Sequence, residues 1–166
     1  ISGYKIGTSS SDSPSMRASR STWIDDLYDS AITNNIVLMH LGTNVTATPT
    51  GSGTAATDYG YLNGLCGEIK GAHGWTIYVD TIPQRNDSGG YSAFCAAYNP
   101  LILGFNAGTD NIDGVFDSGM NGDSPLGRLT SSANTTYFYS DSTHPNNAGT
   151  FVIASAAWAR LTGSPL

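Results

Sequence analysis

Apolar and polar positions alternate in blocks along the chain, and three short apolar blocks are typical of strands. These blocks are IVLMHL at 36–41, WTIYVDTI at 75–82 and IDGVFD at 112–117. The first is rich in branched residues and ends directly in Gly-Thr-Asn, and Pro83 closes the second. Because the first block is almost continuously apolar, we expect a strand that is buried on both faces of a sheet.

Segments with apolar residues at helical spacing separate these strands. Helices are predicted over 21–32, over 58–71, over 89–107 with Pro100 as a candidate kink, and after the turn sequence THPNNAG at 143–149. Strands that alternate with helices predict right-handed crossovers and a parallel sheet covered on both faces. The expected fold class is therefore α/β, a three-layer α/β/α arrangement whose binding site lies beyond the carboxyl ends of the strands.

Composition and charge narrow the classes of function. The chain of 166 residues is long enough for one domain with a substantial core. Only 12% of its residues are charged, against about 25% in a typical soluble domain, which suits a secreted, extracellular protein. A formal net charge of -6 argues against nucleic acid and anionic membranes as partners, because both would repel the chain. No apolar run approaches the roughly 18 residues that span a bilayer.

Cys66 and Cys95 lie on the apolar sides of two predicted helices. An even number of cysteines without a C-x-x-C spacing favours a disulfide over a metal site. We expect the two residues to be bonded, linking the helices on either side of the second strand. The alternative is a pair of buried free thiols.

Two stretches contain residues suited to acyl-transfer chemistry. The sequence LGTNV places Asn44 directly after a buried strand, where its amide can donate a hydrogen bond to a developing oxyanion. In SDSTHPNNAG, Asp141 lies three residues before His144, and a carboxylate beside Nδ1 of an imidazole leaves Nε2 free as a general base. His40 and His73 have no partners at metal-ligand spacing, and we interpret His40 as a hydrogen-bonded core histidine. No metal and no organic cofactor are expected.

Together with ISGYKIG at the amino end, these stretches resemble blocks of the SGNH (GDSL-type) hydrolase family, particularly its secreted acetylxylan esterases of the carbohydrate esterase family 3 type. Gly3 is similar to the second block, Asn44 to the third, and Asp141 with His144 to the fourth. The resemblance implies that His144 is the general base and that Asp141 orients its ring. It also implies an oxyanion hole formed by Gly3 and Asn44. Val45 stands where the family usually has Asp, and its apolar side chain cannot make the supporting hydrogen bond of that Asp.

In that family the nucleophile is a serine in Gly-Asp-Ser, placed after the first strand of a flavodoxin-like sheet. Gly-Asp-Ser occurs here at 122–124, but no strand leads into Ser124 and Pro125 follows it, so this stretch is interpreted as a surface turn. A compressed alternative makes Ser9 in YKIGTSS the nucleophile, after a strand of only about three residues. The position of the nucleophile stays unknown.

The remaining interpretation is a single SGNH-hydrolase-like domain over 1–166 that lacks the N-terminal strand and the Gly-Asp-Ser block. The resemblance implies a five-stranded sheet in the order 2-1-3-4-5, of which the three predicted strands are 3, 4 and 5. The strand at 36–41 then lies at an open edge, which is an aggregation hazard. We expect an N-terminal fragment of the same precursor, carrying the serine, or a second copy of the chain to complete the sheet.

These expectations describe a secreted serine ester hydrolase that removes acetyl groups from plant polysaccharide, similar to an acetylxylan esterase. An acetylated carbohydrate is the expected substrate. The alternative is a catalytically inactive carbohydrate-binding or interaction protein that retains the fold.

Overall fold

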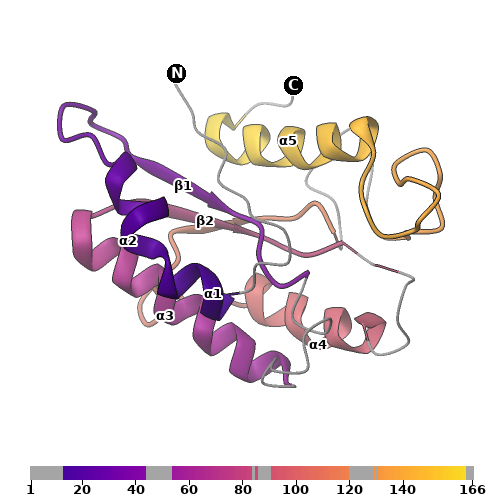
Figure 1. The fold of residues 1–166 in the computed structure, drawn as a ribbon, viewed down its shortest axis with the longest axis horizontal. Coiled ribbons are helices and arrows are strands. Elements are labelled where there is room, and N and C mark those ends of the chain that lie inside the picture. Colours follow the sequence, from indigo (N-terminus) through magenta and orange to yellow (C-terminus); the bar gives the residue numbers. More distant parts are fainter. Residues whose placement is uncertain are drawn as a thin grey trace.

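The computed structural model describes residues 13–43, 54–83, 85, 91–119, 129 and 131–163, and its helices and strands alternate as expected (Figure 1). The helical elements are α1 (Ser13–Ala18), α2 (Arg20–Trp23), the 3-10 turn η1 (Asp25–Leu27), α3 (Ala55–His73), α4 (Tyr91–Leu103) and α5 (Asn147–Thr162). The strands are β1 (Ile36–Met39), β2 (Thr76–Asp80) and β3 (Gly114–Phe116). None of these helices is both long and apolar enough to cross a membrane.

The three strands form one parallel sheet in the order β1-β2-β3, which confirms the expected order. Ile36 pairs with Thr76, and Tyr78 pairs with Gly114, so β2 lies between the other two strands. Gly114 is needed at its position because a Cβ there would lie 2.6 Å from Cε1 of Tyr78. The helices α3 and α4 connect consecutive strands, as parallel pairing requires.

Apolar side chains on the two faces of the sheet build separate layers of the core. Ile77 and Val79 of β2 are fully buried in a cluster with residues of α3 and α4. Tyr78 lies between them in the strand and packs in a second cluster with Ala156 of α5. Figure 1 shows α5 on one side of the sheet and α3 and α4 on the other, so the predicted three-layer α/β/α arrangement is confirmed.

The strand β1 is less buried than its sequence predicts. Ile36 is 40% exposed and Leu38 is 46% exposed, whereas Met39 is buried. Among the described strands, β1 pairs with β2 alone and lies at the edge of the sheet. Within the described part of the chain, β1 is therefore an exposed edge strand, as the interpretation of an incomplete sheet expects, and its burial by another polypeptide stays a prediction.

The helix predicted over 21–32 is broken into α2 and η1, and its second half is a loop. In that loop the side-chain amide of Asn35 donates to the carbonyl oxygens of Asp29 and Ile32. The Asp29 carboxylate accepts from the N–H of Ala31 at 2.9 Å. These side chains satisfy backbone groups that would otherwise pair along a helix axis, so the turn competes with the helix.

Cys66 and Cys95 are buried free thiols, so the predicted disulfide is wrong. The Sγ atom of Cys66 lies 3.9 Å from Sδ of Met39, and that of Cys95 lies 3.8 Å from the carbonyl oxygen of Pro83. Burial raises the pKa of the Cys66 thiol to about 12 and that of Cys95 to about 11. Each thiol contacts a different neighbour and packs in the core as a small apolar residue would. The position of each cysteine on the apolar face of its helix therefore results from packing and not from a disulfide.

Candidate active site

The segment before α5 is tied to that helix by Asn146. This residue is the N-cap, and its side-chain oxygen accepts hydrogen bonds from the N–H groups of Ala148 at 2.9 Å and Gly149 at 3.1 Å. Its amide nitrogen donates in the other direction, to the carbonyl oxygens of Thr136 and Phe138. One side chain thereby fixes both the start of α5 and the loop that leads into it.

Two backbone contacts close the same loop. Phe138 and Pro145 form an antiparallel bridge, and the N–H of Tyr139 donates to the carbonyl oxygen of His144 at 3.0 Å. The Asp-x-x-His segment is therefore held at both of its ends by bonds within the loop.

Within this loop the structure brings Asp141 and His144 together. Nδ1 of His144 lies 2.8 Å from Oδ2 of Asp141, while Oδ1 accepts from the N–H groups of Thr143 at 2.9 Å and His144 at 3.0 Å. Ser142 makes the tight turn between them with a positive φ of 51°. Because an ionised carboxylate only accepts, Nδ1 of His144 carries the proton, and Nε2 is left as an acceptor.

The electrostatics of this pair favour an ionised Asp141. Its hydrogen bond with the His144 side chain, followed by the bonds from the backbone N–H groups, lowers the pKa of Asp141 to about 2. The side chains are exposed, 49% for Asp141 and 74% for His144. The pair therefore presents an oriented imidazole to solvent, which is the arrangement of a general base.

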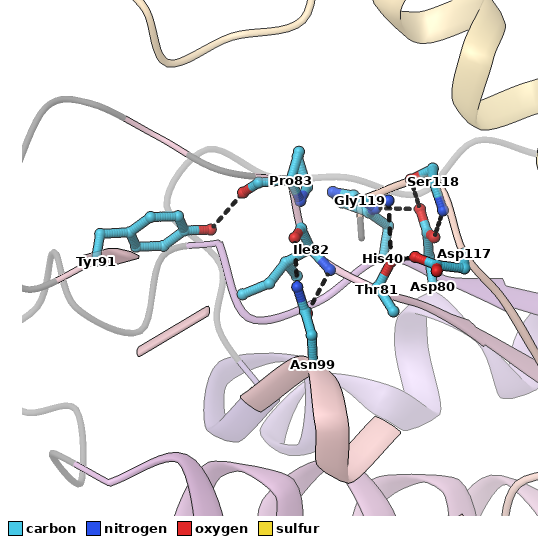
Figure 2. A network of polar contacts seen from close by, with 10 residues as sticks. All are labelled: His40, Asp80, Thr81, Ile82, Pro83, Tyr91, Asn99, Asp117, Ser118 and Gly119. Atoms are coloured by element: carbon cyan, nitrogen blue, oxygen red, sulfur yellow. Dashed lines mark hydrogen bonds and ion pairs between the residues drawn. The ribbon is translucent and has the colours of Figure 1, made fainter. Parts of the chain in front are cut away.

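A second Asp–His pair lies where the strands end (Figure 2). Nδ1 of His40 lies 2.8 Å from Oδ2 of Asp80, and the His40 side chain is 31% exposed. Asp80 is fully buried and also accepts the Ser118 hydroxyl at 2.6 Å and the Ser118 N–H at 3.0 Å. Burial raises the pKa of Asp80, and the hydrogen bonds from His40 and Ser118 oppose that rise.

Sequence analysis found one member of this second pair. The interpretation of His40 as a hydrogen-bonded histidine is confirmed, although its side chain is only partly buried. Asp80 was missed, and the available signal was a carboxylate placed directly at the end of the apolar strand WTIYVD. Such a residue needs a partner because a buried charge is strongly disfavoured on its own.

Beyond β1, the segment that leads to Asn44 is closely fitted. Gly42 has a φ of +123°, and a Cβ on it would lie 2.8 Å from Cε1 of Tyr98. The Arg85 guanidinium donates to the carbonyl oxygen of Thr43 and lies over the ring of Tyr91, 4.9 Å from its centroid. The chain is thus held firmly up to Thr43.

Four candidate residues lie outside the described part of the chain, namely Gly3, Ser9, Asn44 and Ser124. In the part that is described, no three His, Cys, Asp or Glu side chains gather as metal ligands would. Figure 1 shows β1 and β2 running toward the side of the molecule on which α5 begins. His40 and Asp80 therefore lie at the carboxyl edge of the sheet, on the same side of the molecule as the loop that precedes α5.

The fold is similar to that of two solved Bacteroides proteins. A GDSL-like lipase from Bacteroides thetaiotaomicron VPI-5482 superposes with a TM-score of 0.71 at 15% identity, over 95% of this chain and 74% of that one. A candidate acylhydrolase from Bacteroides fragilis NCTC 9343 superposes with a TM-score of 0.69 at 18% identity, over 93% of this chain and 71% of that one. No protein-family model matches the sequence, and no curated protein matches it either. At these identities the likeness establishes the fold alone.

Proposed function

We propose that this protein is an ester hydrolase in which His144 is the general base and Asp141 orients it. The observation that carries the proposal is the 2.8 Å hydrogen bond from Nδ1 of His144 to Asp141, on a histidine that is largely exposed. An imidazole held in this way can move a proton between a hydroxyl nucleophile and a leaving alcohol. The fold shared with a GDSL-like lipase supports the same class of reaction.

The reaction needs these two side chains and a serine. The serine oxygen attacks the ester carbonyl carbon, Nε2 of His144 takes the hydroxyl proton, and the carbonyl electron pair moves onto oxygen. Asp141 stabilises the imidazolium that forms. The bond to the alcohol then breaks, the alcohol takes the proton from His144, and an acyl-serine remains. Water repeats both steps and releases the carboxylic acid and the serine.

We assign the oxyanion hole to the backbone N–H of Gly3 and the side-chain amide of Asn44. The fitted geometry of Gly42 and the Arg85 bond to the carbonyl oxygen of Thr43 support this assignment, because they fix the chain directly before Asn44. Fixed donors stabilise a developing oxyanion without reorganisation during the reaction.

We place the nucleophilic serine on a segment outside this chain, and the edge of β1, which is open among the described strands, supports that placement. Ile36 and Leu38 are exposed on a strand with one described neighbour. A parallel strand added there would bring its carboxyl end beside that of β1. An N-terminal fragment of the same precursor, or a second copy of the chain, would complete the sheet. Ser9 and Ser124 are the candidates within the chain.

The proposed substrate is an acetylated plant polysaccharide, and the proposed location is extracellular. The sequences LGTNV and SDSTHPNNAG support this substrate through their resemblance to acetylxylan esterases. The low charged fraction of 12% supports the extracellular location. Acetylated xylan is therefore the polymer with which to measure release of acetate.

Labelling with a fluorophosphonate during an aryl acetate assay tests the proposal. This probe bonds covalently to an activated serine, and mass spectrometry of the digested protein identifies the residue and the polypeptide that carries it. We expect hydrolysis that the probe abolishes, with the label on a polypeptide other than this chain. A label on Ser9 or Ser124, with loss of turnover in the matching alanine variant, would move the nucleophile into this chain.

An inactive carbohydrate-binding or interaction protein is the second candidate. In favour of it, the Asp141–His144 bond lies within one loop and the His144 side chain is 74% exposed. That candidate predicts no hydrolysis and no label, with retained binding of xylan.

A further inference from the structure

Asp80 is the meeting point of all three strand ends. Its fully buried carboxylate accepts from His40, which follows β1, and from both the hydroxyl and the N–H of Ser118, which lies beyond β3. Asp80 itself ends β2. Figure 2 shows these side chains converging from separate strands. A side chain with three donors in a buried setting has little freedom to move.

The ends of β2 and β3 are joined by a second set of bonds that does not include β1. The Thr81 hydroxyl donates to Asp117 at 2.5 Å and accepts from the N–H of Gly119 at 3.0 Å. The register of β1 with β2 ends at Met39. Beyond that residue, the His40 bond to Asp80 is what ties the β1 end to this network in the described part of the chain.

From Ser118 the contacts continue to the loop of His144. The carbonyl oxygen of Ser118 accepts from the N–H of Leu129 at 3.0 Å. Leu129 packs with Phe138 and Val152 in one buried cluster. Phe138 is bridged to Pro145, the residue after His144.

We propose that His40 and Asp80 are positioning residues, which hold the segment that leads to Asn44 in a fixed place relative to the Asp141–His144 pair. The inference rests on the proposed function, because it assigns these two segments to one active site. It adds a second histidine that acts through its Nδ1–H bond to a buried carboxylate. Its Nε2 takes no part in proton transfer.

Two substitutions of His40 separate the hydrogen bond from the basic nitrogen. The amide of His40→Asn can donate to Asp80 as Nδ1–H does, but it has no basic nitrogen. His40→Phe removes both groups at similar size. Asp80→Asn retains the shape and replaces one acceptor oxygen by a donor. Each variant is first compared with the parent by thermal unfolding, so that kinetics are read on folded protein.

Aryl acetate kinetics give the first measurement. We expect His40→Phe and Asp80→Asn to lower kcat by roughly 10- to 100-fold with KM nearly unchanged, because small misplacement of catalytic groups acts mainly on the chemical step. His40→Asn should retain most of the activity. If His40→Asn loses as much activity as His40→Phe, Nε2 is required and the positioning role is overturned. Unchanged kcat in all three variants overturns it as well.

Amide hydrogen exchange gives a second measurement that needs no turnover. The N–H of Tyr139 is bonded to the carbonyl oxygen of His144, and the N–H of Thr143 is bonded to Asp141. We expect both amides to exchange faster in His40→Phe and not in His40→Asn. Equal exchange in the two variants contradicts the proposal. If the parent protein lacks esterase activity, the proposed function fails while exchange still decides whether the two segments are coupled.

Discussion

The molecule contains two Asp–His pairs with the same 2.8 Å bond and very different surroundings. Asp141 and His144 lie three residues apart in one exposed loop. Asp80 and His40 lie forty residues apart, and their carboxylate is fully buried at the end of the central strand. The local pair is held by its own turn, whereas the distant pair joins separate strands. We therefore expect the Asp141–His144 pair to act in catalysis and the Asp80–His40 pair to stabilise the arrangement of the strand ends.

The two carboxylates also respond oppositely to their surroundings. Hydrogen bonds lower the pKa of exposed Asp141 to about 2, while burial raises the pKa of Asp80. The exposure of the carboxylate to solvent therefore matters as much as its hydrogen bond to a histidine in setting the pKa of the aspartate.

Among the variants, Asp141→Asn tests the difference between the two Asp–His pairs most strongly. The asparagine keeps the size of the side chain but no longer holds His144 in one tautomer, and loss of this control lowers turnover by about 10⁴-fold in a Ser-His-Asp triad. We expect a fall in kcat on the order of 10³- to 10⁴-fold in the aryl acetate assay, in a protein that cooperative urea unfolding shows to be folded. A fall of less than tenfold would show that Asp141 does not orient the base.

Asp80→Ala is expected to act on stability. It leaves the Ser118 donors without an acceptor in a buried site and removes the partner of His40. We expect the free energy of unfolding in urea to fall by about 3 kcal/mol. Asp26→Ala is the control, because Asp26 is an exposed carboxylate, and its effect should stay within about 0.5 kcal/mol. Equal urea midpoints for the two variants would contradict the architectural role of Asp80.

A smaller effect is expected in the pH dependence of stability. The folded state lowers the pKa of Asp141 to about 2, below the value of about 3.9 for an unfolded aspartate, so its contribution is present above pH 4 and is lost as the pH falls toward 2. The contribution of Asp80 to the pH dependence of stability has the opposite sign, because a raised pKa in the folded state favours folding as the pH falls. The urea midpoints of the parent and Asp141→Asn should therefore converge between pH 4 and pH 2. A constant difference over that range would contradict the lowered pKa.

Much of the fold could be predicted from local patterns. The apolar runs at 36–41, 75–82 and 112–117 contain β1, β2 and β3, and alternation with helices predicts their parallel pairing. The break in the helix predicted over 21–32 does not follow from local patterns, because Asp29 and Asn35 bond to nearby backbone groups in a manner that helical periodicity does not encode.

Local sequence patterns also predict only one of the two Asp–His contacts. The Asp141–His144 contact could be inferred because three residues of chain bring the groups together. The Asp80–His40 contact depends on the register between β1 and β2, which no local pattern specifies. The disulfide failed for a related reason, since similar positions of Cys66 and Cys95 on two helices do not fix the direction of their thiols.

Replacement of His144 by alanine tests the central claim most directly. His144→Ala and the control His73→Ala, which alters an exposed histidine at the end of α3, are compared with the parent in the aryl acetate assay. General-base catalysis contributes on the order of 10²- to 10⁴-fold, so we expect His144→Ala to lose nearly all turnover while retaining the thermal stability of the parent. Parent-like activity in His73→Ala completes the expected result. A folded His144→Ala protein that hydrolyses the ester at the parental rate would contradict the assignment of this loop as the active site.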